Sequence, residues 1–299
     1  MASFFDEIAR NRFKSVILMF LFSLLFVGII LLFTTYLGLG IFGLAIAVVL
    51  VLLYAVFIYA AGDKLVLKMS GAKEADRNQY GSLYNAVEGL SAAAQVAMPK
   101  VYIINDPNPN AFATGRNKKV SAIAVTSGLY SMMDRKELEG VIAHETSHIS
   151  NNDIQFMMVA VVFAGAIGII AAFIRTMFFF GGIGGNSRNN NGMILIIALV
   201  VGLLAPLFAL LVRLAISRRR EYMADANGAR LTRDPGALAA ALKKIKGYTA
   251  SPQATPVKQA NEVTASLYFA NPFKASGMMN LFSTHPPIDE RIKRLQSMY

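Results

Sequence analysis

The stretch Asp134–Asn151, which reads DRKELEGVIAHETSHISN, decides the fold of this chain more than any other segment. Asp134 and Glu137 have the spacing of a capping box, in which each side chain bonds the backbone N–H of the other residue. Apolar residues then recur every three or four positions, which is the period of an amphipathic helix. The sequence therefore predicts a helix that begins here and ends near Asn151.

The same segment carries the pattern His-Glu-Thr-Ser-His at positions 144–148. Residues four apart lie on one helix face, so the imidazoles of His144 and His148 can reach one metal ion. Glu145 then stands where it can take a proton from an attacking water and pass it to the leaving amine. The chain has only three histidines, and two fall in this pattern, which makes an accidental match the weaker interpretation.

A catalytic zinc site has three protein ligands and one open position. Glu221 is the best candidate for the third ligand, because it follows an apolar run much as His148 precedes one. Asp225, one helical turn later, is expected to hydrogen-bond an imidazole and fix its tautomer. Glu262 and Glu290 are weaker candidates, and simple pairing of Glu221 with the preceding arginines remains open.

Three further residues are assigned on weaker grounds. His285, which precedes two prolines, is either a turn residue, a donor to the oxyanion, or a removable fourth ligand. Tyr222 is a second candidate for stabilising the oxyanion. Arg291 is expected to pair with Asp225 or to steady the turn at His285.

The composition indicates an integral membrane protein. Hydrophobic residues make up 55% of the chain and charged residues 16%, against about 25% charged in soluble domains. Mean hydropathy is +0.47. Crossing a bilayer takes about 20 apolar residues, and four runs are long enough: Val16–Tyr36, Leu39–Ala61, Phe156–Phe178 and Met193–Ile216. The first run is too long for a signal peptide and is interpreted as an uncleaved anchor.

Flanking charges predict the orientation. The net charge is +11, and basic residues flank the apolar runs at Arg10–Lys14, Lys64, Lys68 and Arg218–Arg220. The positive-inside rule then places both termini and the metal motif on the cytosolic side. The arginine triplet itself is interpreted as a stop-transfer anchor. The chain is therefore expected to cross a membrane several times.

The expected architecture is mainly α-helical, with four transmembrane helices and a small cytosolic α+β unit. Residues 1–61 and 155–217 would form two membrane hairpins, while 62–154 and 218–299 would form the two cytosolic parts. Turn and strand signals in the first cytosolic part predict a small sheet. Its expected elements are a helix at Tyr80–Ala97 and strands at Val101–Ile104, Ala111–Thr114 and Ala122–Thr126. In the second part, an Asp-Pro pair at 234–235 predicts a helix start, and Ile288–Met298 a basic amphipathic helix.

Taken together, these motifs resemble the HtpX-type membrane metalloproteases, which are related to the prenyl-protein endoproteases that process CAAX sequences. The resemblance covers nearly the whole chain. Its motifs are Asn-Ala-Phe-Ala at 110–113, the His-Glu-x-x-His pattern with Asp153 beyond it, Arg-Glu-x-x-Ala-Asp at 220–225, and Thr-His-Pro at 284–286.

The resemblance implies that one zinc ion per chain binds to His144, His148 and Glu221, with Glu145 as the general base. It also implies a gluzincin-like zinc-protease domain facing the cytosol. The implied role is stress-related quality control of misfolded or damaged membrane proteins.

The segment Asn110, Ala111, Phe112 and Ala113 is expected to bind substrate. Sites of this kind hold a peptide as an extra strand on a sheet edge, through backbone hydrogen bonds. The small side chains at Ala111 and Ala113 leave room for that peptide. Backbone binding predicts broad preference among unfolded or membrane polypeptides. An ordinary strand start is the competing interpretation.

Other classes fit less well. A CAAX-type prenyl endoprotease would use the same chemistry, but such enzymes have more than four spans. A non-enzymatic scaffold with structural zinc is disfavoured, because such sites are commonly thiolate-rich and this chain has no cysteine. A transporter would need ionisable residues within its spans. No stretch has the mixed aromatic and basic character of a nucleic-acid module. The sequence leaves the oligomeric state open.

Overall fold

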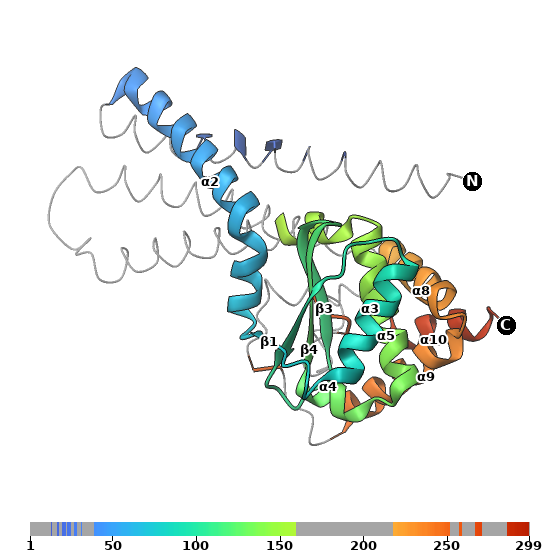
Figure 1. Ribbon diagram of the computed structural model, residues 1–299. Helices are drawn as coiled ribbons and strands as arrows, with labels where there is room; N and C mark the ends of the chain where they lie inside the picture. Colours follow the sequence, from blue (N-terminus) through green and yellow to red (C-terminus); the bar gives the residue numbers. More distant parts are fainter. Residues whose placement is uncertain are drawn as a thin grey trace, which may run out of the picture.

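The computed structural model describes residues 39–159, 218–251, 257–258, 267–270 and 286–298, with single positions between 13 and 31. These residues form a long helix, a four-stranded sheet and a group of helices packed beside it (Figure 1). The elements are α2 (Gly40–Met69), β1 (Lys73–Glu74), α3 (Gly81–Ala93), β2 (Lys100–Ile104), β3 (Ala111–Asn117), β4 (Val120–Thr126), α4 (Ser127–Met132), α5 (Arg135–Ser150), α8 (Arg218–Thr232), α9 (Pro235–Ala250) and α10 (Ile288–Gln296).

The sheet has the strand order β1-β2-β4-β3. β2 and β4 run parallel, whereas β3 is antiparallel to β4 and β1 to β2. The three strands expected from the sequence are confirmed. β1 was not expected, because its two residues are exposed and polar and carry no strand pattern. The order leaves β3 at one edge of the sheet.

Helices cover both faces of the sheet. Figure 1 shows α2 on one side and α3 and α5 on the other, with α8, α9 and α10 beyond α5. β4 is buried along its whole length except at Val120, and its centre, residues 122–125, is an apolar run typical of a strand covered on both sides. Ala111 and Ala113 of β3 pack in the same core as α5. The core therefore lies between the sheet and the helix with the metal motif.

The helix starts follow local sequence signals. The Asp134 side chain accepts from the Glu137 N–H at 2.9 Å, and the Glu137 carboxylate accepts from the Asp134 N–H at 2.8 Å. The expected capping box of α5 is thus confirmed. α9 has a simpler cap, in which the Asp234 side chain accepts from the Ala237 N–H at 3.0 Å, with Pro235 in the first turn. Both caps can be predicted from the sequence alone, because each depends on residues only three positions apart.

The apolar runs are only partly described. Within the described residues no single helix passes as a membrane span, but the limbs Phe42–Tyr54 and Val56–Met69 of α2 do so together, across a bend of 41°. Large apolar side chains on α2 are open, with Phe42 74% and Val56 66% exposed. The first, third and fourth expected spans lie largely outside the described residues, so their number and orientation stay predictions.

Candidate metal centre

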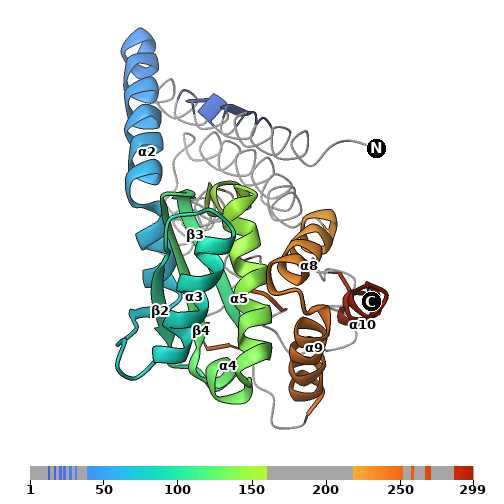
Figure 2. The ribbon, with the colours of Figure 1, turned by 45° about the vertical axis from the view of Figure 1, so that its right-hand side comes forward.

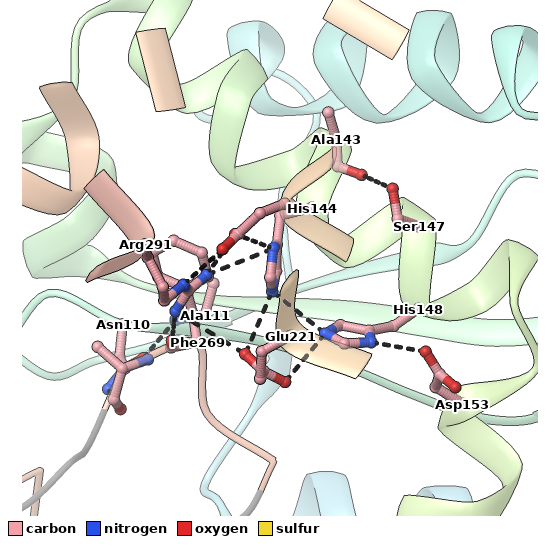
Figure 3. A network of polar contacts seen from close by, with 12 residues as sticks. Asn110, Ala111, Ala143, His144, Ser147, His148, Asp153, Glu221, Phe269 and Arg291 are labelled. Atoms are coloured by element: carbon pink, nitrogen blue, oxygen red, sulfur yellow. Dashed lines mark hydrogen bonds and ion pairs between the residues drawn. The ribbon is translucent and has the colours of Figure 1, made fainter. Parts of the chain in front are cut away.

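His144 and His148 project from adjacent turns of α5 toward one point (Figure 3). Their Nε2 atoms are 3.1 Å apart. Both side chains are buried, at 0% and 4% exposure. The helical spacing expected from the sequence therefore brings the two imidazoles together as ligands of a single ion would be.

Glu221 completes the cluster from α8, which lies beside α5 (Figure 2). Its carboxylate oxygens are 3.7 Å from Nε2 of His144 and 3.5 Å from Nε2 of His148. In a tetrahedral site with bonds of about 2.0 to 2.2 Å, ligand atoms lie about 3.3 to 3.6 Å apart. The three donors lie close to that spacing, and they form a group that could hold a metal ion. Two imidazoles and one carboxylate also form the donor set of known catalytic zinc sites.

The second nitrogen of each imidazole faces a buried carboxylate. Nδ1 of His144 is 3.0 Å from Asp225, and Nδ1 of His148 is 3.1 Å from Asp153. A carboxylate at Nδ1 favours the proton on that atom, so Nε2 is the atom of each ring that faces the candidate metal position. Asp225 was expected in this role. Asp153 was noted only as part of a motif, although its position five residues after His148, just beyond the end of α5, was a usable signal.

Arg291 ties α10 to this cluster. Its guanidinium donates to both oxygens of Asp225, at 2.9 and 2.7 Å, and to the carbonyl oxygen of Phe269 at 3.0 Å. It is 1% exposed, and it lies 3.8 Å from Glu221. The expected pairing with Asp225 is confirmed. Arg291 supplies the positive charge that two buried carboxylates require.

The electrostatics differ between the two histidines. Burial lowers the pKa of His144 to about 4, so this imidazole is neutral. Burial also opposes charge on His148, but the hydrogen bond that it donates to Asp153 and the charge of Glu221 outweigh burial and raise its pKa to about 9. The pKa of Asp225 is lowered, because Arg291 and His144 outweigh the effect of burial.

Glu145 lies beside the ligands without joining them. Its side chain is 1% exposed, and its Oε1 atom has no hydrogen-bond partner. Burial raises its pKa to about 7, and a hydrogen bond donated by the backbone of Ala113 partly offsets this. A carboxylate with a pKa near neutrality can both accept and return a proton.

The expected substrate edge on β3 is partly taken up by the chain itself. The N–H of Phe269 donates to the carbonyl oxygen of Ala111 at 2.8 Å. The side-chain amide of Asn110 donates to the carbonyl oxygen of Ala270 at 2.8 Å and accepts from its N–H at 3.1 Å. Residues 269–270 thus lie along this end of β3, a contact that the sequence analysis missed.

Several other candidates lie elsewhere. Tyr222 is on α8, but its hydroxyl is hydrogen-bonded to Glu290 and its ring lies 3.7 Å from the guanidinium carbon of Arg294. The structure therefore does not bring Tyr222 or Glu290 to the ligand cluster, and we leave both out of the mechanism. His285 and Glu262 lie outside the described residues.

Arg220 differs from the expected membrane anchor. Arg218 and Arg219 are exposed, whereas Arg220 is 7% exposed and its guanidinium carbon lies 4.4 Å from the Phe156 ring centre. The charges of Asp153 and Glu221 act on it. The third arginine of the triplet therefore belongs to the surroundings of the metal centre.

Comparisons with known proteins place the chain among peptidases. The model of peptidase family M48 matches residues 77–299. The "Protease HtpX homolog" of Dictyoglomus thermophilum is 45% identical, over 99% of this chain and 95% of that protein. The protein of the same name from Streptococcus thermophilus is 43% identical, over 98% and 99%. The crystal structure of S. mikatae Ste24p is 19% identical with a TM-score of 0.49, over 83% of this chain and 57% of that one.

The family match contains all three ligand candidates and Glu145. The curated relatives match almost from end to end and carry the name of a protease. The chain therefore belongs to peptidase family M48 and is a metalloendopeptidase of the HtpX type.

Proposed function

We propose that this metalloendopeptidase is embedded in the bacterial inner membrane. There it hydrolyses peptide bonds of misfolded or damaged membrane proteins, at a site that faces the cytosol. The observation that carries the proposal is the triangle of His144, His148 and Glu221 with Glu145 beside it.

We assign His144, His148 and Glu221 as the ligands of one zinc ion. Bound there, zinc would supply a Lewis acid that polarises the peptide carbonyl and makes water acidic enough to attack near neutral pH. The donor set of two imidazoles and one carboxylate fits this ion, and it leaves one side open for substrate. Asp225 and Asp153 keep the Nδ1 atoms protonated and the rings oriented.

Glu145 is the proposed general base. Its raised pKa of about 7 suits it to take a proton from the attacking water and to return that proton to the leaving amine. The unpartnered Oε1 is the atom that can receive the proton. We keep His285 as a proposed donor to the oxyanion.

Substrate recognition is proposed to use the backbone of β3. β3 is the edge strand, and an extended peptide can add to such an edge by main-chain hydrogen bonds. Residues 269–270 lie at Asn110 and Ala111, so we place the substrate chain from Ala113 onward. The Ala113 N–H is also next to the Glu145 carboxylate. Backbone recognition fits substrates that share no sequence.

The membrane assignment is supported by the exposed apolar side chains of α2 and by basic residues where the apolar runs meet the described domain. Lys64 and Lys68 lie at the end of α2, and Arg218 and Arg219 at the start of α8; all four are exposed. Lysine and arginine gather on the cytosolic side of membrane proteins. From both places the chain enters the domain that holds the metal centre, which supports its cytosolic placement.

The test uses the full-length protein purified in detergent, stripped of metal and then given zinc. Cleavage of casein, an unfolded protein, is measured for wild type and for Glu145→Gln, with bound zinc counted in both. We expect zinc to restore cleavage in wild type only, while both variants bind one ion. Loss of a general base lowers the rate by about 10² to 10⁴.

Two results would count against the proposal. Equal cleavage by Glu145→Gln would remove Glu145 as the base. Cleavage of a farnesylated CAAX peptide without cleavage of casein would favour the prenyl-protein alternative.

A misfolded membrane protein and its folded form, both in liposomes with the enzyme, test the substrate class. We expect only the misfolded form to be cut.

A further inference from the structure

Gly228 lies on the face of α8 that carries Glu221 and Asp225. Positions 221, 225 and 228 follow one another by four and three residues, so they share one side of the helix. All three are buried. This side faces α5, the helix of the two histidines, and Figure 2 shows the two helices next to each other.

At Gly228 the two helices touch through their backbones. A methyl group at this position would lie 3.0 Å from the backbone nitrogen of His144, 3.2 Å from its Cα atom and 3.3 Å from the carbonyl carbon of Ala143. These are backbone atoms, which cannot rotate away as the end of a long side chain can. Any side chain at 228 must therefore push α8 away or displace the backbone of His144 itself.

The size of this displacement matters for metal binding. Contacts of 3.0 to 3.3 Å are tight for a methyl group, so its neighbours must move by about a few tenths of an ångström. A metal site tolerates errors of only about 0.2 Å in its ligand distances. A shift of this size can be tolerated by a packed core. It exceeds the tolerance of a metal site whose ligands are His144 on one helix and Glu221 on the other.

We propose that Gly228 is a positioning residue for the metal centre. Its lack of a side chain sets the separation of α5 and α8 at which His144 and Glu221 reach the same ion. This inference rests on the proposed ligand role of His144, His148 and Glu221. It assigns to Gly228 a function in metal affinity beyond the packing of the fold.

The chain offers two matched control positions in helices. Gly140, on α5, is equally crowded, since a methyl group there would lie 3.0 Å from the nitrogen and the Cα of Leu238, but its neighbour is α9. Gly247, on α9, has nothing within 4 Å. Glycine to alanine favours a helix by about 1 kcal/mol at each position. Gly228→Ala, Gly140→Ala and Gly247→Ala therefore differ mainly in what the new methyl group meets.

The experiment measures the zinc dissociation constant of the full-length protein by competition with a chromophoric chelator. Cobalt-loaded samples give a visible spectrum that reports ligand geometry, and thermal unfolding reports stability. Gly228→Ala is expected to weaken zinc binding about tenfold or more, as loss of an outer-shell contact does, and to change the cobalt spectrum. Gly140→Ala is expected to lower the unfolding temperature with wild-type zinc affinity, and Gly247→Ala to keep wild-type zinc affinity.

Each other outcome is decisive. If Gly228→Ala and Gly140→Ala bind zinc equally well, the positioning role is wrong. If Gly228→Ala fails to fold even with zinc present, the contact serves the fold, and the inference is overturned as well. If wild type binds no zinc, the proposed function fails first and takes this inference with it. The wild-type measurement therefore separates the two failures.

Discussion

Arg291 grips Asp225 with two parallel hydrogen bonds, of 2.9 and 2.7 Å, while Asp225 lies 3.0 Å from Nδ1 of His144. The three side chains come from α10, α8 and α5, and none is more than 2% exposed. Paired donors from one guanidinium fix a carboxylate in angle as well as in distance. Through Asp225, α10 thereby determines the orientation of His144, a proposed metal ligand that lies far from α10 in the sequence.

Replacing Arg291 by methionine is expected to damage both stability and metal binding. Asp225 would keep its buried charge and lose its main partner, which costs about 3–5 kcal/mol in buried pairs. Zinc affinity is expected to fall about 10- to 100-fold, because His144 is no longer held in place. Chemical denaturation and zinc competition give the two numbers.

Arg294→Met is the control for that substitution, on the same helix. Arg294 pairs with Glu290 at 2.8 Å, but both side chains are about half exposed, at 52% and 45%. Such surface pairs contribute about 0.2–1 kcal/mol. Similar losses in Arg291→Met and Arg294→Met would contradict a special role for the buried pair.

Zinc binding is expected to strengthen as the pH rises toward 9. Asp153 and Glu221 raise the pKa of His148 to about 9 in the metal-free protein, so at neutral pH a metal must displace its proton. Affinity should then rise about tenfold per pH unit up to that point and level off above it. His144, with a pKa lowered to about 4, loses no proton in this range. Zinc titrations from pH 6.5 to 9.5 test this, and a flat profile would contradict it.

Asp153→Asn should move this profile. An amide accepts the same hydrogen bond but lacks the charge that raises the pKa of His148, so the plateau is expected at lower pH. Above the plateau, the variant should bind zinc about 10- to 100-fold more weakly than wild type, because the imidazole is a poorer donor without the carboxylate. Glu139→Gln, on the exposed surface pair of α5 with Arg135, is the control. If Asp153→Asn showed the wild-type dependence of zinc affinity on pH, Asp153 would have no role in setting the pKa of His148.

Sequence patterns could predict the parts of the site that depend on neighbouring residues. The cap of α5 and the shared face of His144 and His148 both follow from helical spacing, and both are seen. Glu221 was reached by a longer argument, from its place beside an apolar run. The geometry around it agrees, and its role as a ligand remains our proposal.

Contacts between distant segments could not be predicted in this way. Asn110 hydrogen-bonds Ala270, which is 160 residues away in the sequence. Its side-chain amide bonds both the N–H and the carbonyl of Ala270, as a neighbouring strand would. Tyr222 and Arg220 both lie next to Glu221 in sequence, yet Tyr222 packs against Arg294, whereas Arg220 packs against Phe156 near the metal centre. Which way a side chain on α8 faces depends on where α5 and α10 pack, and no local spacing specifies that.

The role of Asn110 can be decided by separating stability from substrate binding. Its amide holds residue 270, whose neighbour Phe269 bonds Arg291 and packs its ring 4.8 Å from that of His144. Asn110→Ala would leave a buried N–H and carbonyl of Ala270 without these bonds, and each such group costs about 1–3 kcal/mol. We therefore expect lower unfolding stability and a lower kcat, with KM for casein unchanged.

Exposed Asn85 on α3 provides the control, Asn85→Ala, which should stay within about 0.5 kcal/mol of wild type. A raised KM in Asn110→Ala, together with wild-type stability, would instead mean that this amide binds substrate. In that case residues 269–270 would have to leave the edge of β3 before a substrate enters. The two results are distinct, since stability falls with KM unchanged in the first and KM rises with stability unchanged in the second.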